Sequence, residues 1–231
     1  MKKTLSKSIK GSATYNTAQE KRDFKPILIY PLCAIGLGGI VAGILANQRG
    51  VDIRDTNVLL IGNVVGLSVA ALLFLIIYRQ RLALDIKRFA SRDYLKYTII
   101  CAILMIFCAI LCDKVLAFVG ATSENQQTVE AMMGSQFILS NIMAVILAPI
   151  CEEFVFRYSI GSIFKSDWLF YPISVLAFAL VHSTGIAMIS YAVVAIFTGI
   201  VYRKTKNNIV AAIIMHFINN LLATVFFVLG W

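Results

Sequence analysis

Two glutamates stand side by side inside an apolar stretch, in the segment APICEEFVFR at residues 148–157. Ionisable side chains are costly in a hydrocarbon environment, so at such positions they indicate a functional site by default. Glu153 and Arg157 are four residues apart in the favourable glutamate-before-arginine order, which predicts an ion pair along one helix face. Glu152 is rotated by about 100° from Glu153, so it stays available as a general base. The alternative is that both glutamates are ordinary interfacial charge at a helix end.

The chain has two histidines, and both lie deep in apolar segments. His182 ends the sequence FALVH that begins at Phe178, and His216 begins the sequence HFINN. Asn220 follows His216 by one helical turn, so the two side chains lie on the same helix face. Each histidine taken alone is as well explained by a hydrogen bond that joins two helices.

The depths of these polar groups favour a shared site. At 1.5 Å per helical residue, Glu152, His182 and His216 each lie roughly 14–15 Å from the same end of their segments. That is about half of a hydrocarbon core of ~30 Å. We therefore expect the three side chains to meet at one level, between three helices.

The composition shows what kind of protein must position them. Hydrophobic residues make up 59% of the 231-residue chain and charged residues only 14%, with a mean hydropathy of +0.82. A soluble domain carries about 25% charged residues, so these values predict an integral membrane protein and exclude a disordered chain or a secreted disulfide scaffold. The five cysteines lie in or beside apolar segments and form no C-x-x-C pair, which favours packing over metal binding.

Apolar runs of membrane-spanning length predict an all-α, polytopic helical bundle. The count is about seven transmembrane helices, with six to eight allowed because residues 113–136 are ambiguous. We expect a basic cytoplasmic segment at residues 1–26 and a single transmembrane domain at 27–231. Gly39 and Gly43 form a small-xxx-small pair that predicts close helix packing in the first span. The expected spans are 27–46, 58–78, 95–112, 137–164, 168–182, 186–202 and 208–229.

The net charge of +9 is explained by topology. If the seven segments alternate, 17 Lys and Arg residues fall on one side and three, Arg49, Arg54 and Lys114, on the other. Basic residues accumulate in cytoplasmic loops, so the N-terminus is expected in the cytoplasm and Trp231 outside the cell membrane. The basic balance then gives no reason to expect nucleic acid as a partner.

Three motifs in this order resemble a known family. E-E-x-x-x-R at Glu152, F-x-x-x-H at Phe178 and H-x-x-x-N at His216 are similar to the motifs of the CPBP family. That family comprises the type II CAAX prenyl endopeptidases and the bacterial CAAX-protease and bacteriocin-processing proteins, also called Abi proteins. The resemblance covers about residues 139–222. It implies that Glu152, His182, His216 and Asn220 are catalytic, with Glu153 and Arg157 flanking them and Phe178 in support.

The resemblance implies an intramembrane endopeptidase that cleaves peptides or protein tails at the cytoplasmic side, in bacteriocin maturation or self-immunity. Glu152, assisted by His182, would activate water, and His216 and Asn220 would donate hydrogen bonds to the oxyanion. Two alternatives stay open: a non-catalytic immunity or scaffold protein that binds a peptide, and a proton-coupled transporter.

The metal requirement is also open at this stage. Glu152, His182 and His216 could form a two-histidine, one-carboxylate site for a divalent metal such as zinc, with Asn220 beside it. We expect a metal-free mechanism, because an amide such as that of Asn220 is a good oxyanion donor and a poor zinc ligand.

Overall fold

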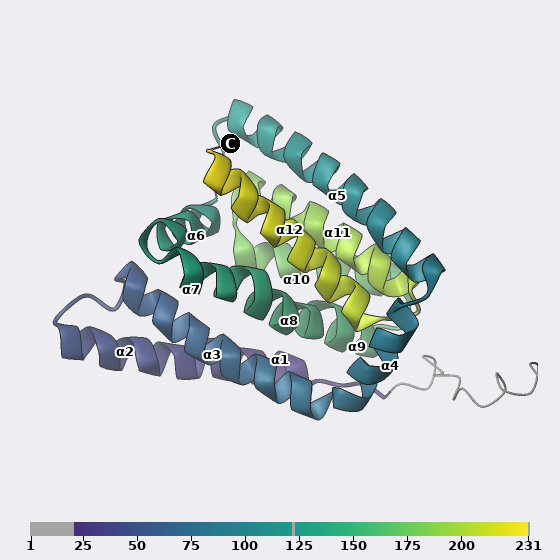
Figure 1. The fold of residues 1–231 in the computed structure, drawn as a ribbon, viewed down its shortest axis with the longest axis horizontal. Helices are drawn as coiled ribbons and strands as arrows, with labels where there is room; N and C mark the ends of the chain where they lie inside the picture. Colours follow the sequence, from purple (N-terminus) through teal and green to yellow (C-terminus); the bar gives the residue numbers. More distant parts are fainter. Residues whose placement is uncertain (1–20, 122, 231) are drawn as a thin grey trace, which may run out of the picture.

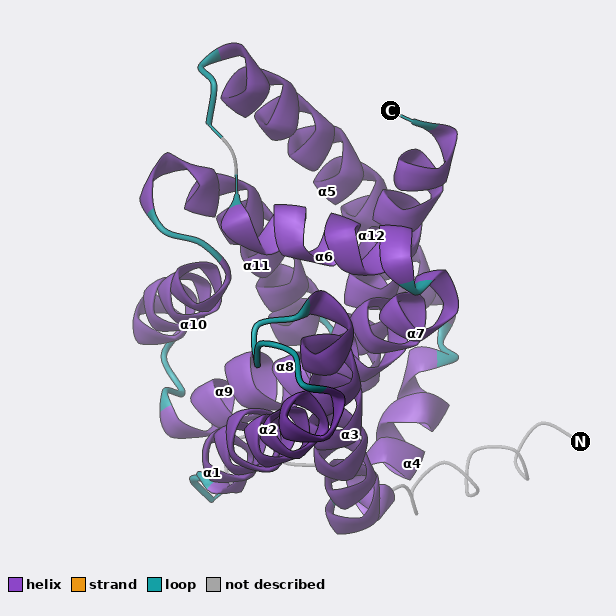
Figure 2. Ribbon diagram, turned by 90° about the vertical axis from the view of Figure 1, so that its left-hand side faces the viewer, coloured by secondary structure: helices purple, strands orange, loops and turns teal. Residues whose placement is uncertain are grey.

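The computed structural model describes residues 21–121 and 123–230. Within that part of the chain the secondary structure is entirely helical (Figure 2). Most of the predicted basic segment at 1–26, and Trp231, lie outside the described residues. The α-helices are α1 (Lys25–Pro31), α2 (Gly38–Arg49), α3 (Thr56–Ile77), α4 (Arg79–Phe89), α5 (Arg92–Phe118), α6 (Glu124–Ser135), α7 (Phe137–Asn141), α8 (Ala148–Glu153), α9 (Ile160–Ile163), α10 (Asp167–His182), α11 (Met188–Lys204) and α12 (Ile209–Leu229).

Several of these helices join into continuous membrane-spanning rods. Six rods in the described chain are long and apolar enough to cross a bilayer, and α10 is a shorter apolar helix of 16 residues. The all-α polytopic membrane bundle predicted from the sequence is thereby confirmed. The six rods are Lys25–Arg49, Thr56–Ile77, Arg92–Phe118, Phe137–Ile163, Gly185–Lys204 and Ile209–Leu229.

The rod Phe137–Ile163, which holds the glutamate pair, lies at the centre of the bundle (Figure 1). Helices α1 to α3 pack on one side of it, and α10, α11 and α12 pack on the other, with α5 outermost. Aromatic contacts join α3 and its C-cap Tyr78 to the rod: the Phe154 ring lies 5.1 Å from that of Phe74, to which it is tilted, and is stacked on that of Tyr78 at 4.9 Å. The central position places Glu152 and Glu153 within reach of helices from both ends of the sequence.

Local sequence signals explain where the helices begin and end. Side-chain oxygens of Asp55, Ser91 and Asn208 accept hydrogen bonds from the first backbone N–H groups of α3, α5 and α12, which otherwise have no helical partner. Gly50 ends α2 with φ of 65°, in the left-handed region that glycine enters without steric cost. The register of the spans is therefore set by caps as well as by hydrophobicity.

Two helices lie in segments that the sequence left unassigned. Helix α4 occupies the loop expected between the second and third spans, and Asp85 fixes it to α12 by accepting a hydrogen bond from the backbone N–H of Ile209 at 3.0 Å. Helix α6 occupies the ambiguous stretch 113–136 and is capped by Ser123, whose hydroxyl accepts from the N–H of Gln126 at 3.3 Å.

The glycine prediction for the first span was wrong in its residues. A Cβ on Gly39 would meet nothing within 4 Å, and one on Gly43 only the Ile53 side chain at 3.8 Å. The close approach instead uses Gly38 and Gly62, since a Cβ on Gly62 would lie 2.5 Å from the carbonyl oxygen of Gly38. The packed face of the rod is thus offset by one residue from the one expected.

Candidate active site

Two π-helical segments flank the glutamate pair in the central rod. They span Ile142–Leu147 and Phe154–Ser159. A π-helical turn disturbs the normal hydrogen-bond ladder and is frequent at functional sites. Carbonyl oxygens in these turns accept bonds from neighbouring helices: Ala144 O from Asn220 Nδ2 and Phe156 O from Ser174 Oγ, each at 2.7 Å. The unusual helix geometry is thus stabilised by side chains of α12 and α10.

Glu152 lies where the three polar helices meet. Its Oε2 atom is 3.4 Å from Nε2 of His182 and 3.9 Å from Nε2 of His216, and the residue is 6% exposed. The structure therefore brings together the three side chains that the depth argument placed at one level. Their catalytic roles remain a prediction.

His182 is held by its other nitrogen and by two aromatic rings. Its Nδ1 atom is 2.7 Å from the carbonyl oxygen of Phe178. A carbonyl oxygen only accepts, so this contact assigns the proton to Nδ1 and turns Nε2 toward Glu152. The imidazole is stacked on Phe178 at 4.3 Å and on Tyr191 at 5.0 Å. A neutral ring would set a lone pair against the carboxylate, and a separation of 3.4 Å leaves no room for a water between the two atoms, so the arrangement fits a proton shared by the pair.

His216 is oriented in the same way by Glu153. Nδ1 of His216 lies 2.9 Å from Glu153 Oε1, and the second oxygen of Glu153 lies 3.2 Å from Nε of Arg157. The predicted Glu153–Arg157 ion pair is thereby confirmed. The contact with His216 was missed, because it joins residues 63 positions apart and no local spacing signals it.

Arg157 is fully buried beneath the site. Its guanidinium donates to the hydroxyl of Thr198 through Nε at 3.0 Å and through Nη2, and it lies 4.7 Å from the centre of the Phe178 ring. Phe178 thus contacts both His182 and Arg157, which gives the predicted supporting residue a physical role.

Asn220 lines the same cavity as Glu152. Its amide donates one N–H to Ala144, and its oxygen accepts from Nδ2 of Asn219 at 3.1 Å. A side-chain amide has two N–H groups, so one remains for a ligand. The oxyanion role of Asn220 stays a prediction that uses this second N–H.

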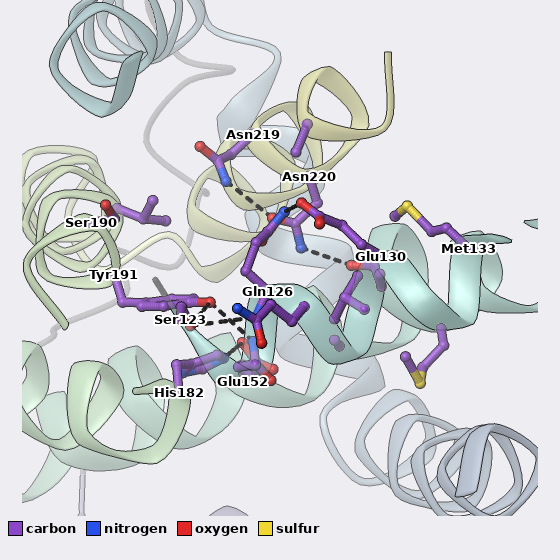
Figure 3. Close-up of a pocket in the computed structure, with 18 of the residues that line it drawn as sticks. Ser123, Gln126, Glu130, Met133, Glu152, His182, Ser190, Tyr191, Asn219 and Asn220 are labelled. Carbon is purple, nitrogen blue, oxygen red and sulfur yellow. Dashed lines mark hydrogen bonds and ion pairs between the residues drawn. The ribbon is translucent and has the colours of Figure 1, made fainter. Parts of the chain in front are cut away.

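The cavity above Glu152 has a volume of about 1310 Å³. Buried Glu152, Phe178 and His216 line it together with His182, and the exposed residues Gln126 and Glu130 of α6 mark its mouth. Figure 3 shows Gln126 and Glu130 among the lining residues with Glu152 and His182. The hydroxyl of Tyr191 lies 3.1 Å from Ser123 Oγ and from Asn125 Nδ2, which joins the His182 stack to the start of α6. Sequence reasoning missed these three residues, since two of them lie in the ambiguous segment.

The residues that mark the mouth belong to α6. This helix lies at the end of the bundle opposite α4 (Figure 1). The sequence led us to expect both that the basic end is cytoplasmic and that the site opens to the cytoplasm. The basic residues Lys87, Arg92 and Lys204 lie in α4, at the start of α5 and at the end of α11. The expected cytoplasmic opening is therefore inconsistent with the expected orientation.

The metal prediction depends on the positions of Glu152, His182 and His216. The described residues include no group of three or more His, Cys, Asp or Glu side chains placed to hold a metal ion. Ligand atoms about 2 Å from a tetrahedral zinc ion lie roughly 3.3 Å from one another. Glu152 Oε2 lies 3.4 Å from His182 Nε2 and 3.9 Å from His216 Nε2, so these two separations alone exclude no ion, and the metal-free mechanism stays a prediction. No chemical step below uses a metal.

The fold and the site define a multi-pass membrane protein with a buried glutamate–histidine constellation at the floor of a large cavity. Residues 134–222 match the family described as type II CAAX prenyl endopeptidase Rce1-like. This stretch contains Glu152, His182, His216 and Asn220, and the match confirms the resemblance to the CPBP and CAAX-protease family that the motifs indicated.

A curated relative is similar over a shorter stretch. The chain is 39% identical over 61 residues to the UPF0177 protein YajF of Lactococcus lactis subsp. lactis (strain IL1403). The similarity covers 26% of this chain and 30% of YajF. No solved structure matches the chain significantly.

Proposed function

We propose that this protein is an intramembrane endopeptidase of the CAAX-protease type. The observation that supports this most directly is the pairing of Glu152 Oε2 with His182 Nε2 at 3.4 Å, on the floor of a cavity of about 1310 Å³. Both residues lie in the stretch that matches the protease family. A carboxylate beside an oriented imidazole in a cavity is suited to activate water for attack on a peptide carbonyl.

Hydrolysis would proceed through a water molecule in the cavity that is hydrogen-bonded to the Glu152 carboxylate, beside His182. Glu152 removes one proton from the water as its oxygen bonds to the carbonyl carbon of the substrate. The carbonyl oxygen becomes an oxyanion, which accepts hydrogen bonds from protonated His216 and from the second amide N–H of Asn220. The proton on Glu152 then passes to the peptide nitrogen as the C–N bond breaks, giving a carboxylic acid and an amine.

Glu153 contributes by positioning His216. Its carboxylate, 2.9 Å from Nδ1, stabilises the protonated imidazole that donates from Nε2 to the oxyanion. Arg157 holds the Glu153 carboxylate in place, with its Nε 3.2 Å from Oε2. Removal of one oxyanion donor costs about 3–4 kcal/mol in other enzymes, so the Glu153–His216 contact matters for rate as well as for stability.

The substrates would be peptides or protein tails at the surface of the cell membrane, with the lipid bilayer as the surrounding partner. The chain offers a cavity between membrane helices as the place where such a segment binds. The family resemblance favours bacteriocin maturation or self-immunity as the biological setting.

The proposal is tested by incubating purified protein with a defined peptide library, with Glu152→Gln as the inactive variant. Mass spectrometry in H₂¹⁸O should find ¹⁸O in the new carboxyl group for the wild type only. Peptides that bind to both proteins and are cut by neither would overturn the protease proposal in favour of a peptide-binding immunity protein. Proton-coupled uptake in proteoliposomes that is lost in the variant would favour a transporter.

A further inference from the structure

The two ends of the bundle differ in charge. Lys87 and Arg92 lie at one end with α4, together with Lys204 at the end of α11. Asp113 and Glu130 lie at the other end, at the cavity mouth. Basic residues concentrate on the cytoplasmic side of membrane proteins, so the α4 end is the cytoplasmic end.

The cavity is closed toward the α4 end. Directly below Glu152, the central rod and α11 place Glu153, Phe154, Arg157 and Thr198, each with 0% exposure. Toward the other end the lining passes to exposed residues of α6 and reaches Gly230 after α12. Of the two ends of the bundle, only the α6 end therefore gives water access to Glu152.

From this arrangement we infer that the substrate reaches Glu152 from the non-cytoplasmic face of the membrane, and that it is a positively charged peptide with apolar side chains. The inference rests on the proposed protease function and names the substrate class and its side of access. Three features of the cavity support it: its location, its size and its charge.

The size fits a stretch of peptide. Small-molecule pockets have volumes of about 300–1,000 Å³, and this cavity, at about 1310 Å³, exceeds that range. Its walls combine apolar side chains, among them Leu67, Ile110 and Phe226, with polar groups from α6. Such a surface can bury alternating apolar residues of an extended chain.

The charge of the lining is negative at the mouth. Asp113 accepts a hydrogen bond from Ser190 at 2.6 Å, and Glu130 from Gln126 at 2.9 Å. Both donors are neutral side chains, and the lining residues in the described chain include no Lys or Arg. A cationic segment would be attracted to this mouth and an anionic one repelled.

The side of access is tested by cysteine labelling in intact cells, which does not depend on catalysis. The five native cysteines are replaced by alanine, and single cysteines are introduced as Gln127→Cys at the mouth and Lys204→Cys at the α4 end. A membrane-impermeant maleimide should label Gln127→Cys in intact cells and Lys204→Cys only after permeabilisation. The reverse pattern would overturn the inference, and native-like gel filtration of each variant excludes misfolding as the cause.

The charge preference is tested by binding to purified Glu152→Gln protein, so that a failure of catalysis cannot hide it. The probes are two fluorescent ten-residue peptides, one of alternating Lys and Leu and one of alternating Glu and Leu. The lysine peptide should bind at least about fivefold more tightly at low salt, the ratio expected for one charge pair near 4 Å in water. Added salt should reduce the difference.

A matched pair of variants assigns that preference to the mouth. Asp113→Asn with Glu130→Gln should remove the difference in affinity between the two peptides. Asp93→Asn alters an exposed carboxylate at the start of α5, near the α4 end, and should leave that difference unchanged. Equal binding of both peptides to Glu152→Gln protein would overturn the charge assignment. Selective binding of the lysine peptide together with no cleavage of any peptide by the wild type would refute the protease proposal and leave this inference standing.

Discussion

The buried ion pair between Glu153 and Arg157 makes a sharp prediction about stability. Both side chains are fully buried, and the pair is 3.2 Å long. Glu153→Gln removes the negative charge but keeps the shape, so Arg157 becomes an unpaired buried cation. Removal of one partner of such a pair costs about 3–5 kcal/mol in the free energy of unfolding.

The structure also indicates which interactions make up this loss of stability. Glu153 is bonded to His216 as well, and a hydrogen bond to a charged group contributes about 1.5–3 kcal/mol. Arg157 retains Thr198 as an acceptor in the variant. Replacing both partners by apolar residues, Glu153→Leu with Arg157→Met, removes the unpaired charge, so the double variant should lose less stability than the sum of its single variants.

The assay is reversible unfolding in mixed detergent micelles, followed by helical circular dichroism, for the wild type, Glu153→Gln, the single variants Glu153→Leu and Arg157→Met, and the double variant that combines these last two. We expect a coupling energy of about 2–3 kcal/mol between the two sites. If Glu153→Gln unfolds within about 0.5 kcal/mol of the wild type, and Arg157→Met does the same, the ion pair does not stabilise the fold and the reasoning is refuted.

Three further predictions concern pH, metal and the aromatic support. Burial raises the pKa of the Asp85 carboxyl despite the nearby Arg81, so the folded protein binds this proton more tightly than the unfolded chain does. The free energy of unfolding should therefore fall as pH rises above about 4. Asp85→Asn should flatten that slope in unfolding measured from pH 4 to 7. Elemental analysis should find less than one zinc per active chain, and cleavage should persist after thorough chelation; activity restored only by zinc would contradict this. Phe178→Leu should lower the free energy of unfolding by about 1–3 kcal/mol, because the aromatic contacts with His182 and His216 are lost. It should also lower the cleavage rate at saturating substrate. An unchanged rate would show that Phe178 does not support the site.

The sequence predicted those features that depend on local periodicity. The apolar segments, the Glu153–Arg157 pair and the meeting of Glu152 with both histidines follow from helix rise, side-chain spacing and the thickness of a bilayer. Each of these features follows from the order and spacing of residues along the chain, so it can be predicted before the fold is known.

Features that arise from packing between distant segments could not be predicted in the same way. The contact of Glu153 with His216 and the stack of Tyr191 on His182 depend on which helices become neighbours. Helix α6 has a polar composition that also suits a loop, and only its position at the mouth gives it a role. The direction in which the cavity opens follows from where α6 lies, which no spacing of residues reveals.

The central claim is that Glu152 is the base that activates water. The direct measurement is the single-turnover rate of peptide cleavage by Glu152→Gln, compared with Glu130→Gln, which alters a carboxylate at the mouth of the same cavity. Glu152→Gln should fold normally and lose at least about 100-fold in rate, the lower bound for removal of a general base, while Glu130→Gln stays within about fivefold of the wild type. A Glu152→Gln protein that cleaves at the wild-type rate would contradict the account.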